Sequence, residues 1–347
     1  MNSAEATEEL CAIYVDMGTT KTRVWLVRGN EILARGSKTV GVGDTARDGS
    51  TTRIQSGLKE LITAMLTPAN KTSASNTPEA IVAAGMIGSP LGLAEVPHVS
   101  APAGLREIAH ASRWFQFSEI TDLPFLVVPG VRSGLTGVDL EVLADVDVMR
   151  GEETLCLGLI ELELVRPPVV VLNLGSHWKA IRLNMDGRIQ SSVTSLSGEL
   201  IHAAQTQTVL ASSVSKKWPA KISQRWMEEG MKEQGRSGLP RALFSVRLLD
   251  LTGKGTEEDR LSFLVGAFIA ADLDALVARG ILVETIPVVI SGNEALAEAW
   301  REALGERSVQ AKVLTSAETE EATLAGLKSI LRQVMAGSGS VLTWVVP

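Results

Sequence analysis

An aspartate, a glycine and two threonines follow a short apolar run near the start of the chain, in the stretch YVDMGTTKTRVWLV. At a tight turn, backbone N–H groups and threonine hydroxyls converge as donors for phosphate oxygens, and glycine allows close approach. The stretch therefore indicates a phosphate turn made by Asp16, Gly18, Thr19 and Thr20. Asp16 is also the candidate ligand of a hydrated Mg²⁺ ion, which uses one or two protein carboxylates. An ordinary hairpin loop favours the same residue types and stays open on this motif alone.

Two later turns carry related chemistry. Another buried run is followed by a turn whose candidate phosphate-binding residues are Gly175, Ser176, His177 and Lys179. In VVISGNEALAEAW, a strand runs into Gly292 and then into a helix with Asn293 near its start. Helix N-termini bind anions and polar groups, and glycine lets a ribose and base lie on the backbone. Together the three turns indicate one bound nucleotide.

Length and composition limit the classes of protein. A chain of 347 residues with 45% hydrophobic residues suits two globular domains of about 150 residues each. The net charge of −7 argues against non-specific binding to nucleic acid or to an anionic membrane, so small soluble ligands are favoured. The two cysteines lie in no metal-binding pattern, the N-terminus is acidic, and no apolar run approaches about 18 residues. These features predict a soluble protein of the reducing cytoplasm.

The periodicity of the chain indicates a repeated arrangement of strands. Strands over 12–16, 22–28 and 31–34 precede a helix over 53–65, a polar loop over 67–78 and a buried strand in AIVAAGMIGS. The same strand–turn–strand–strand pattern returns roughly 155 residues later, in VVVLNLGSHWK and the two strands after it. Further helices are predicted over 257–277, 294–304 and 318–334, a flexible tip at 337–339, and the final VLTWVVP is left unassigned.

The order of these motifs resembles a known superfamily. The DxGTT hairpin, the second glycine turn and the strand–SG–helix element are similar to the two-domain ATP-binding proteins that include actin, hexokinase and the heat-shock chaperone ATPases. Within that superfamily, the chain resembles the 2-keto-3-deoxygalactonate kinase (2-dehydro-3-deoxygalactonokinase) family from about residue 12 to residue 331. The stretches that carry this resemblance are VDMGTTKTRVWLV, AAGMIGSPLGLAEVPHVSAPAG, VPGV with DVMRGEET, LGSHWK with DGRI, and SLSGEL. The combination of GMIGS, PAG and DVMRGEE is specific, whereas DxGTT alone is not.

The resemblance implies an α/β fold in which two RNase H-like domains of the actin-like ATPase type face each other across a cleft. We expect a first domain over 1–167 that holds mainly the sugar acid and the first phosphate turn. A second domain over 168–317 would hold mainly ATP, and a C-terminal helix and tail over 318–347 would pack back on the first domain. The implied reaction transfers the γ-phosphoryl group of ATP, with Mg²⁺ as cofactor, to the terminal C6 hydroxyl of 2-keto-3-deoxygalactonate.

The segment DVMRGEE supplies the candidates for catalysis, because phosphoryl transfer needs positioning, charge stabilisation and a group that takes the hydroxyl proton. By resemblance, Asp147 is the predicted base and Arg150 its catalytic companion, with Glu152 and Glu153 as the alternative bases. A charged helix terminus, in which Arg150 pairs with a glutamate one turn along, is the structural alternative.

The substrate carboxylate needs a positive or N–H-rich pocket. Arg150 offers its planar fork of donors, and Arg23 matches the family pattern GTTxxR and suits either ligand. Other predicted substrate contacts are Glu152, Ala103 and the turn Gly85, Met86, Ile87, Gly88 and Ser89. Structural turns around a core remain the alternative for GMIGS and PAG, and His98 is either a substrate contact or a buried, hydrogen-bonded histidine.

Two turns depart from the family pattern, which usually reads DWGTT and GTHSKW where this chain has DMGTT and GSHWKA. Trp178 is bulky enough to obstruct a phosphate unless its ring turns away. Two other functions therefore stay open: a kinase for another sugar acid or polyol, and a non-catalytic sugar-acid or nucleotide sensor acting through a protein partner. No nucleic-acid or membrane partner is expected, a homodimer stays open, and the sequence does not separate galactonate-derived from gluconate-derived substrates.

Overall fold

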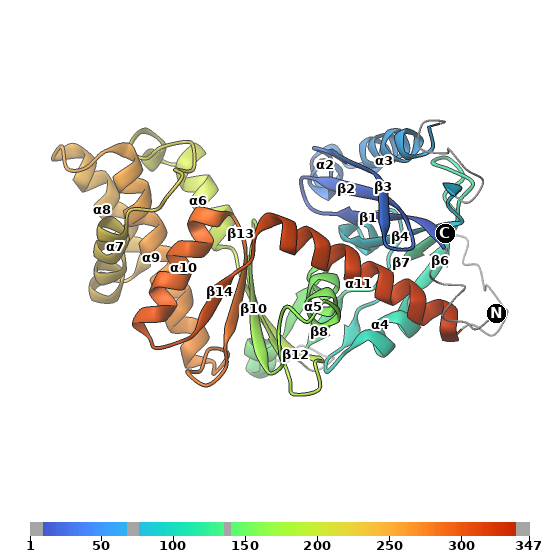
Figure 1. Ribbon diagram of the computed structural model, residues 1–347. Helices are drawn as coiled ribbons and strands as arrows, with labels where there is room; N and C mark the ends of the chain where they lie inside the picture. Colours follow the sequence, from blue (N-terminus) through green and yellow to red (C-terminus); the bar gives the residue numbers. More distant parts are fainter. Residues whose placement is uncertain (1–9, 68–75, 135–139, 338–347) are drawn as a thin grey trace. The chain divides into compact units, whose positions relative to one another are not determined.

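The computed structural model describes residues 10–67, 76–134 and 140–337. Most of the loop predicted over 67–78, part of the tip predicted over 337–339 and the final VLTWVVP lie outside these residues. The chain forms two compact units. Of the described residues, unit 1 contains those up to 164, residues 187–189 and residues 320–337, and unit 2 contains 165–186 and 190–319 (Figure 1).

The sheet of unit 1 has the strand order β3-β2-β1-β4-β7-β6. Its strands are β1 (Cys11–Met17), β2 (Thr22–Arg28), β3 (Glu31–Lys38), β4 (Ala80–Gly85), β6 (Arg113–Phe115) and β7 (Phe125–Val127). The first three form an antiparallel meander, and β4 lies parallel to β1. Because β1 and β4 are covered on both faces, they read as nearly continuous apolar runs. The meander predicted from the sequence is confirmed, although β3 is longer than expected.

Helices and a second, small sheet complete the first part of unit 1. They are α2 (Val42–Asp48), α3 (Thr52–Met65), η2 (Met86–Gly88), α4 (Leu105–Ala111), η3 (Leu140–Asp145) and α5 (Glu152–Glu161), with β5 (Val99–Ser100), β8 (Val131–Ser133) and β9 (Asp147–Met149). The face of α3 predicted from helical spacing is buried: Ile54, Leu58, Leu61, Ile62 and Met65 all lie in the core.

The last helix, α11 (Ser316–Gly337), belongs largely to unit 1 and runs alongside α5 (Figure 1). The two helices approach through glycines: a Cβ placed on Gly158 would lie 1.6 Å from the Ala322 carbonyl oxygen, and one on Gly326 would lie 1.9 Å from the Thr154 carbonyl oxygen. Small residues therefore let the backbones of α5 and α11 touch. In addition, the indole N–H of Trp25 donates to the carboxylate of Glu320, on α11, at 2.9 Å.

Unit 2 repeats the order of the first five strands in the sheet of unit 1. Its sheet has the order β12-β11-β10-β13-β14, with β10 (Val169–Leu174), β11 (Trp178–Leu183), β12 (Ile189–Ser195), β13 (Val288–Gly292) and β14 (Ala311–Val313). As in unit 1, an antiparallel meander is followed by a strand parallel to its first member. This is the RNase H-like order, so the predicted α/β fold and its internal repeat are confirmed.

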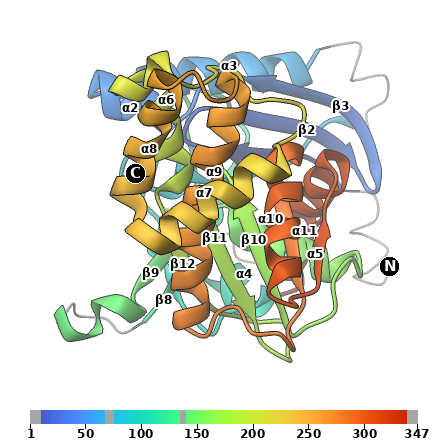
Figure 2. The same cartoon turned by 90° about the vertical axis from the view of Figure 1, so that its left-hand side faces the viewer.

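Helices make up the rest of unit 2. They are α6 (Ser197–Thr206), η4 (Val209–Ser212), α7 (Gln224–Ser237), α8 (Leu239–Leu251), α9 (Glu257–Ala278) and α10 (Glu294–Glu306). Helices α9 and α10 lie over the strands (Figure 2), and their apolar residues form one core with β10, β11 and β13. Helices α9, α10 and α11 correspond to the three predicted late helices, whereas α7 and α8 were not predicted.

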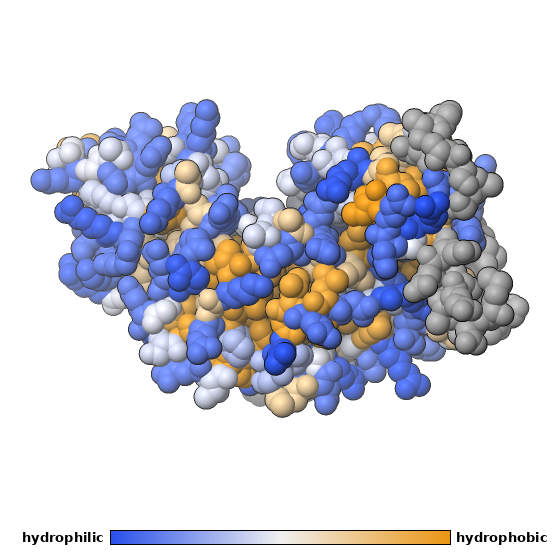
Figure 3. All heavy atoms as spheres, viewed as in Figure 1, coloured by the Kyte–Doolittle hydropathy of each residue, from blue (hydrophilic) through white to orange (hydrophobic). Residues whose placement is uncertain are grey.

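Helix α9 is long and apolar enough to pass for a membrane span, so the expectation that no apolar stretch approaches that length was wrong. However, 67% of its apolar window is buried, as in a core helix of a globular unit. Helices α7 and α8 pack on it, and the surface over these two helices is mostly hydrophilic (Figure 3).

Candidate functional site

The first phosphate turn lies at the carboxyl edge of the sheet of unit 1. Asp16 is near the end of β1, and β1 pairs with β4 so that Met17 lies beside Gly85. Across the hairpin, Arg23 donates to Asp16 Oδ2 from Nε at 3.1 Å and from a terminal nitrogen at 2.6 Å. The Asp16 carboxylate is thus fixed through one oxygen, in a charge-assisted pair.

Two glycines lie close to the other oxygen, Asp16 Oδ1. Gly85 and Gly151 both have left-handed backbones, with φ of 83° and 106°. A Cβ on Gly85 would lie 3.4 Å from Asp16 Oδ1, and one on Gly151 would lie 3.9 Å from it. A Cβ on Gly151 would also lie 3.4 Å from the Gly85 Cα. The end of β4 and the start of α5 therefore meet at Asp16.

Arg150, just before α5, reaches back toward the predicted GMIGS turn. One terminal nitrogen donates to the Val96 carbonyl oxygen at 2.6 Å and lies 3.4 Å from His98 Nδ1. The other, Nη1, is buried and has no hydrogen-bond partner, and a Cβ on Gly88 would lie 3.2 Å from it. Burial lowers the pKa of Arg150 from its usual value, while Glu153 and Glu95 oppose that shift. Arg150 thus brings a spare buried donor to the glycine turn.

The three candidate bases occupy different environments. Asp147 is on β9 opposite Ser133. Glu152 is partly buried at the first position of α5, next to Gly151. Glu153 is fully buried, and its two carboxylate oxygens accept the Gly151 N–H at 2.9 and 2.8 Å. Burial, followed by the charge of Glu152, raises the pKa of Glu153 to about 8.

The remaining predicted contacts of unit 1 divide into two groups. Ile87 is fully buried within η2, and the Ser89 hydroxyl donates to the Met86 carbonyl oxygen at 2.7 Å. These residues hold the turn that carries Gly88. Ala103 is fully buried, and its N–H and C=O both bond to Ile189, so its backbone groups are already used.

A short helix that the sequence motifs did not reveal supports the first turn. Thr19 and Thr20 are exposed, and the Thr19 carbonyl oxygen accepts the Gly43 N–H of α2 at 2.8 Å. A Cβ on Gly41 would lie 2.4 Å from the Gly18 carbonyl oxygen. The signal in the sequence was GVGD, because the Asp44 carboxylate accepts the Gly41 N–H at 3.1 Å and caps the helix.

The second turn has the same support. Gly175, Ser176 and His177 are exposed between β10 and β11. A Cβ on Gly198, in the first turn of α6, would lie 2.4 Å from the Gly175 carbonyl oxygen. Gly198 follows Gly175 at the same interval of 23 residues that separates Gly41 from Gly18. The two units therefore repeat not only the strands but also the glycine contact that carries each turn.

Trp178 does not cover this turn, because its ring points into the core of unit 2. It is 2% exposed and packs edge-on against Trp300, with ring centroids 5.6 Å apart. Lys179, the next residue along the strand, is also buried, and its Nζ donates to Thr194 Oγ1 at 2.5 Å. The exposed donors of the turn are thus those of Gly175 to His177, with His177 Nε2 3.2 Å from Glu199 Oε2.

The third turn lies at the same edge of the sheet as the second. Gly292 ends β13 and pairs with Leu174, which directly precedes Gly175. Its φ of 139° and the 2.7 Å that would separate a Cβ from the Leu174 carbonyl oxygen both require glycine. Asn293 caps α10, since its Oδ1 accepts the Leu296 N–H at 3.2 Å. Within unit 2, the second and third turns are therefore neighbours at the carboxyl ends of parallel strands, where α/β sheets bind ligands.

Asp272, on α9, is a support residue that the sequence motifs did not reveal. Its Oδ2 accepts the hydroxyls of Ser195 at 2.5 Å and Ser197 at 2.9 Å, and so holds the start of α6 against the second turn. Burial raises the pKa of Asp272 above its usual value. It also lines a cavity of about 170 Å³ together with Trp178 and Trp300. Asp272 stands in no local motif, which is why the sequence did not indicate it.

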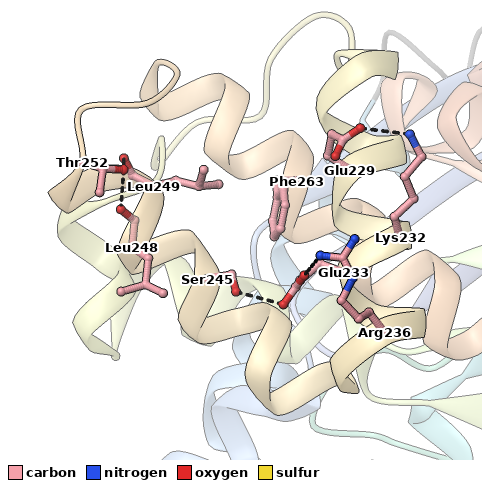
Figure 4. A pocket seen from close by; sticks show the side chains of 9 residues that line it. All are labelled: Glu229, Lys232, Glu233, Arg236, Ser245, Leu248, Leu249, Thr252 and Phe263. Atoms are coloured by element: carbon pink, nitrogen blue, oxygen red, sulfur yellow. Dashed lines mark hydrogen bonds and ion pairs between the residues drawn. The ribbon is translucent and has the colours of Figure 1, made fainter.

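Among residues 10–67, 76–134 and 140–337, no group of three His, Cys, Asp or Glu side chains is placed to hold a metal ion. A second pocket of unit 2, of about 260 Å³, lies between α7, α8 and α9 (Figure 4). Its charged side chains pair with each other, as Lys232 does with Glu229 at 2.9 Å. None of the predicted site residues lines it.

A sequence model of the 2-keto-3-deoxy-galactonokinase family matches residues 16–330. The chain belongs to this family. It is 24% identical over 325 residues to 2-dehydro-3-deoxygalactonokinase of Escherichia coli (strain K12), covering 93% of this chain and 98% of the relative. It is also similar to the crystal structure of a candidate 2-dehydro-3-deoxygalactonokinase from Sinorhizobium meliloti, with a TM-score of 0.72, 25% identity and coverage of 92% and 98% of the two chains.

Membership of the 2-keto-3-deoxy-galactonokinase family makes this chain a carbohydrate kinase with an actin-like ATPase fold. The resemblance inferred from the motifs is thereby confirmed. The match includes Asp16, the segment from Asp147 to Glu153 and both turns of unit 2.

Proposed function

We propose that this protein transfers the γ-phosphoryl group of ATP to the C6 hydroxyl of 2-keto-3-deoxygalactonate in the cytoplasm, with Mg²⁺ as cofactor. The observation that carries the proposal is the meeting of Arg150, the GMIGS turn and the start of α5 beside Asp16. These segments carry the resemblance to the kinase family, and in the fold Gly85 and Gly151 lie beside the Asp16 carboxylate. Two buried free thiols, Cys11 and Cys156, fit a reducing compartment.

The sugar acid is proposed to bind to unit 1. The buried Nη1 of Arg150 has no protein partner, and a carboxylate oxygen would satisfy it. An unsatisfied buried donor costs about 1–3 kcal/mol, so a ligand that pairs with it gains affinity. His98, which contacts the same guanidinium, would then act on the substrate through Arg150.

The nucleotide is proposed to bind to unit 2, with its phosphates on Gly175 to His177 and its ribose and base near Gly292 and Asn293. The inward-facing Trp178 supports this arrangement, because the departure from the family pattern leaves the turn open. In unit 1, Asp16 would hold Mg²⁺ through Oδ1, since Arg23 donates only to Oδ2. When bound, Mg²⁺ neutralises charge on the transferred phosphoryl group.

Glu152 is the base we propose, in place of Asp147, which the sequence favoured. Its position at the start of α5 is next to Gly151, which contacts Gly85 and Asp16. A carboxylate there would take the proton of the attacking hydroxyl, and Arg150 on the other side of Gly151 would orient the substrate.

The proposed function is tested by ADP release with Mg-ATP and a panel of acceptors. The panel contains 2-keto-3-deoxygalactonate, 2-keto-3-deoxygluconate, glycerol and common hexoses. We expect only keto-deoxy acids to stimulate release, because the spare donor of Arg150 calls for a carboxylate. Stimulation by glycerol or a hexose would assign another substrate, and ATP binding without stimulated release would favour a sensor.

Replacing Gly198 by alanine tests the nucleotide turn of unit 2. The new Cβ would lie 2.4 Å from the Gly175 carbonyl oxygen, so the turn must shift. We expect the KM for ATP to rise at least tenfold and the KM for the sugar acid to change less than twofold. Gly235→Ala is the matched control, because a Cβ at Gly235 meets nothing within 4 Å. An unchanged KM for ATP in Gly198→Ala would remove the turn from the nucleotide site.

A further inference from the structure

Glu153 is a fully buried acid that the proposed reaction does not use directly. It is the second residue of α5, and both of its carboxylate oxygens face the N–H of Gly151. The Gly151 carbonyl oxygen is held as well, because the Thr154 hydroxyl donates to it at 2.6 Å. The backbone N–H and the backbone carbonyl of Gly151 are therefore both hydrogen-bonded to side chains of the helix that it precedes.

The conformation that these contacts fix sets the direction of two functional side chains. With φ at 106°, Gly151 turns the chain sharply between Arg150 and Glu152. A Cβ on Gly151 would lie 3.4 Å from the Gly85 Cα, an ordinary contact, so it is the positive φ that favours glycine here. A change at Gly151 would move the guanidinium at the glycine turn and the carboxylate at the start of α5 together.

We propose that Glu153 is a positioning residue that locks Gly151 and thereby aims Arg150 and Glu152 at the substrate. The proposal rests on the proposed function for the roles of Arg150 and Glu152. The contact of Glu153 with Gly151 does not depend on those roles.

The surroundings of Glu153 favour its neutral form. Burial is the largest cause that raises its pKa to about 8, and the charge of Glu152 on the same helix adds to it. The Gly151 N–H and the charge of Arg150, just before the helix, act in the opposite direction. The buried thiol of Cys156, on the same helix, also lies within the electrostatic reach of Glu153, which helps to raise the pKa of that thiol. Helix α11 contacts α5 through the backbone of Ala322, beside Gly158, and of Gly326, beside Thr154. A proton on Glu153 also spares Glu152 a second negative charge beside it.

The first test compares the pH profiles of kcat/KM for the sugar acid in wild type, Glu153→Gln and Glu153→Ala. Glutamine is neutral and keeps an acceptor for the Gly151 N–H, so we expect a loss of no more than about threefold at pH 7. We also expect wild-type kcat/KM to fall above about pH 8 and the glutamine variant to lack that decline. Alanine removes the acceptor, so kcat/KM should fall at least tenfold at every pH. Equal activity of wild type and Glu153→Ala, or parallel pH profiles of wild type and Glu153→Gln, would overturn the proposal.

The second test needs no substrate and separates this inference from the proposed function. A buried acid with a raised pKa stabilises the fold below its unfolded pKa of about 4.5, and that contribution is lost as the pH rises toward 8. From pH 6 to pH 8 the unfolding constant of wild type should therefore rise about fiftyfold relative to Glu153→Gln. Thr154→Val is the matched control, since it loosens Gly151 from the other side without changing charge. It should lower kcat/KM and keep the wild-type dependence of stability on pH. Parallel stability curves for wild type and Glu153→Gln would show an ionised Glu153 and refute the neutral acid.

Discussion

Replacing Glu152 by glutamine should lower kcat for phosphoryl transfer by about 10²- to 10⁴-fold, the usual contribution of a general base. Glutamine keeps the size of the side chain but does not accept the hydroxyl proton. The KM values for ATP and sugar acid should stay within a few-fold, because Arg150 and the turns of unit 2 are unchanged. The effect should therefore appear almost wholly in kcat.

Asp147→Asn is the matched control, since it removes one carboxylate from the same DVMRGEE segment. Asp147 is on β9 opposite Ser133, and we expect its substitution to change kcat less than threefold. Steady-state kinetics with calorimetric binding of ATP to both variants make the comparison. The opposite result, in which Asp147→Asn loses turnover and Glu152→Gln keeps it, would return the base to Asp147.

Gly158→Ala should lower the free energy of unfolding of unit 1 more than a conservative substitution on its surface does. The added Cβ would lie 1.6 Å from the Ala322 carbonyl oxygen of α11, and no side-chain rotation relieves a clash with backbone. Helices α5 and α11 must separate, and we expect a loss of about 3 kcal/mol or more in the free energy of unfolding. For a unit of this size, that corresponds to a fall of about 6–12 °C in melting temperature.

Gly305→Ala on α10 is the control for Gly158→Ala, because a Cβ at Gly305 meets nothing within 4 Å. Alanine is the better helix former by about 1 kcal/mol, so the control should be as stable as wild type or slightly more stable. Thermal unfolding of both variants gives the difference. A melting temperature of Gly158→Ala within 2 °C of wild type would contradict tight contact between the two helices.

Local patterns were sufficient for most of the fold. The hairpin at Asp16 and its later copy were predicted because buried strands read as apolar runs ended by polar turns. The face of α3 followed from helical spacing. Helices α7 and α8 were missed since most of their residues are partly or fully exposed, and their apolar faces are short. The tertiary partner that stabilises them, α9, is not visible in their own sequence.

The site was predictable only where a motif carries its own chemistry. Asp16 and the turn residues stand in such motifs, and the fold brings Asp16, Gly85 and Arg150 into one place as three separate motifs meet. The supporting role of Asp272 and the hydrogen bond between Glu153 and Gly151 depend on tertiary contacts, which the spacing of residues in the sequence does not predict. Trp178 illustrates the converse, because strand alternation decided that a bulky residue in a phosphate turn faces inward.

The contact between Gly158 and Ala322 joins residues 164 positions apart, so α5 is synthesised well before the helix that covers it. At about 5–20 residues per second, a ribosome needs on the order of ten seconds between translating α5 and its partner α11. During that interval the sheet of unit 1 and all of unit 2 up to Thr319 are synthesised. The glycine face of α5 and the indole of Trp25 stay exposed to solvent until α11 is made. A nascent chain stalled after unit 2 would contain a complete unit 2 and a unit 1 that lacks α11. Holdase chaperones would then bind to the exposed apolar surface of unit 1.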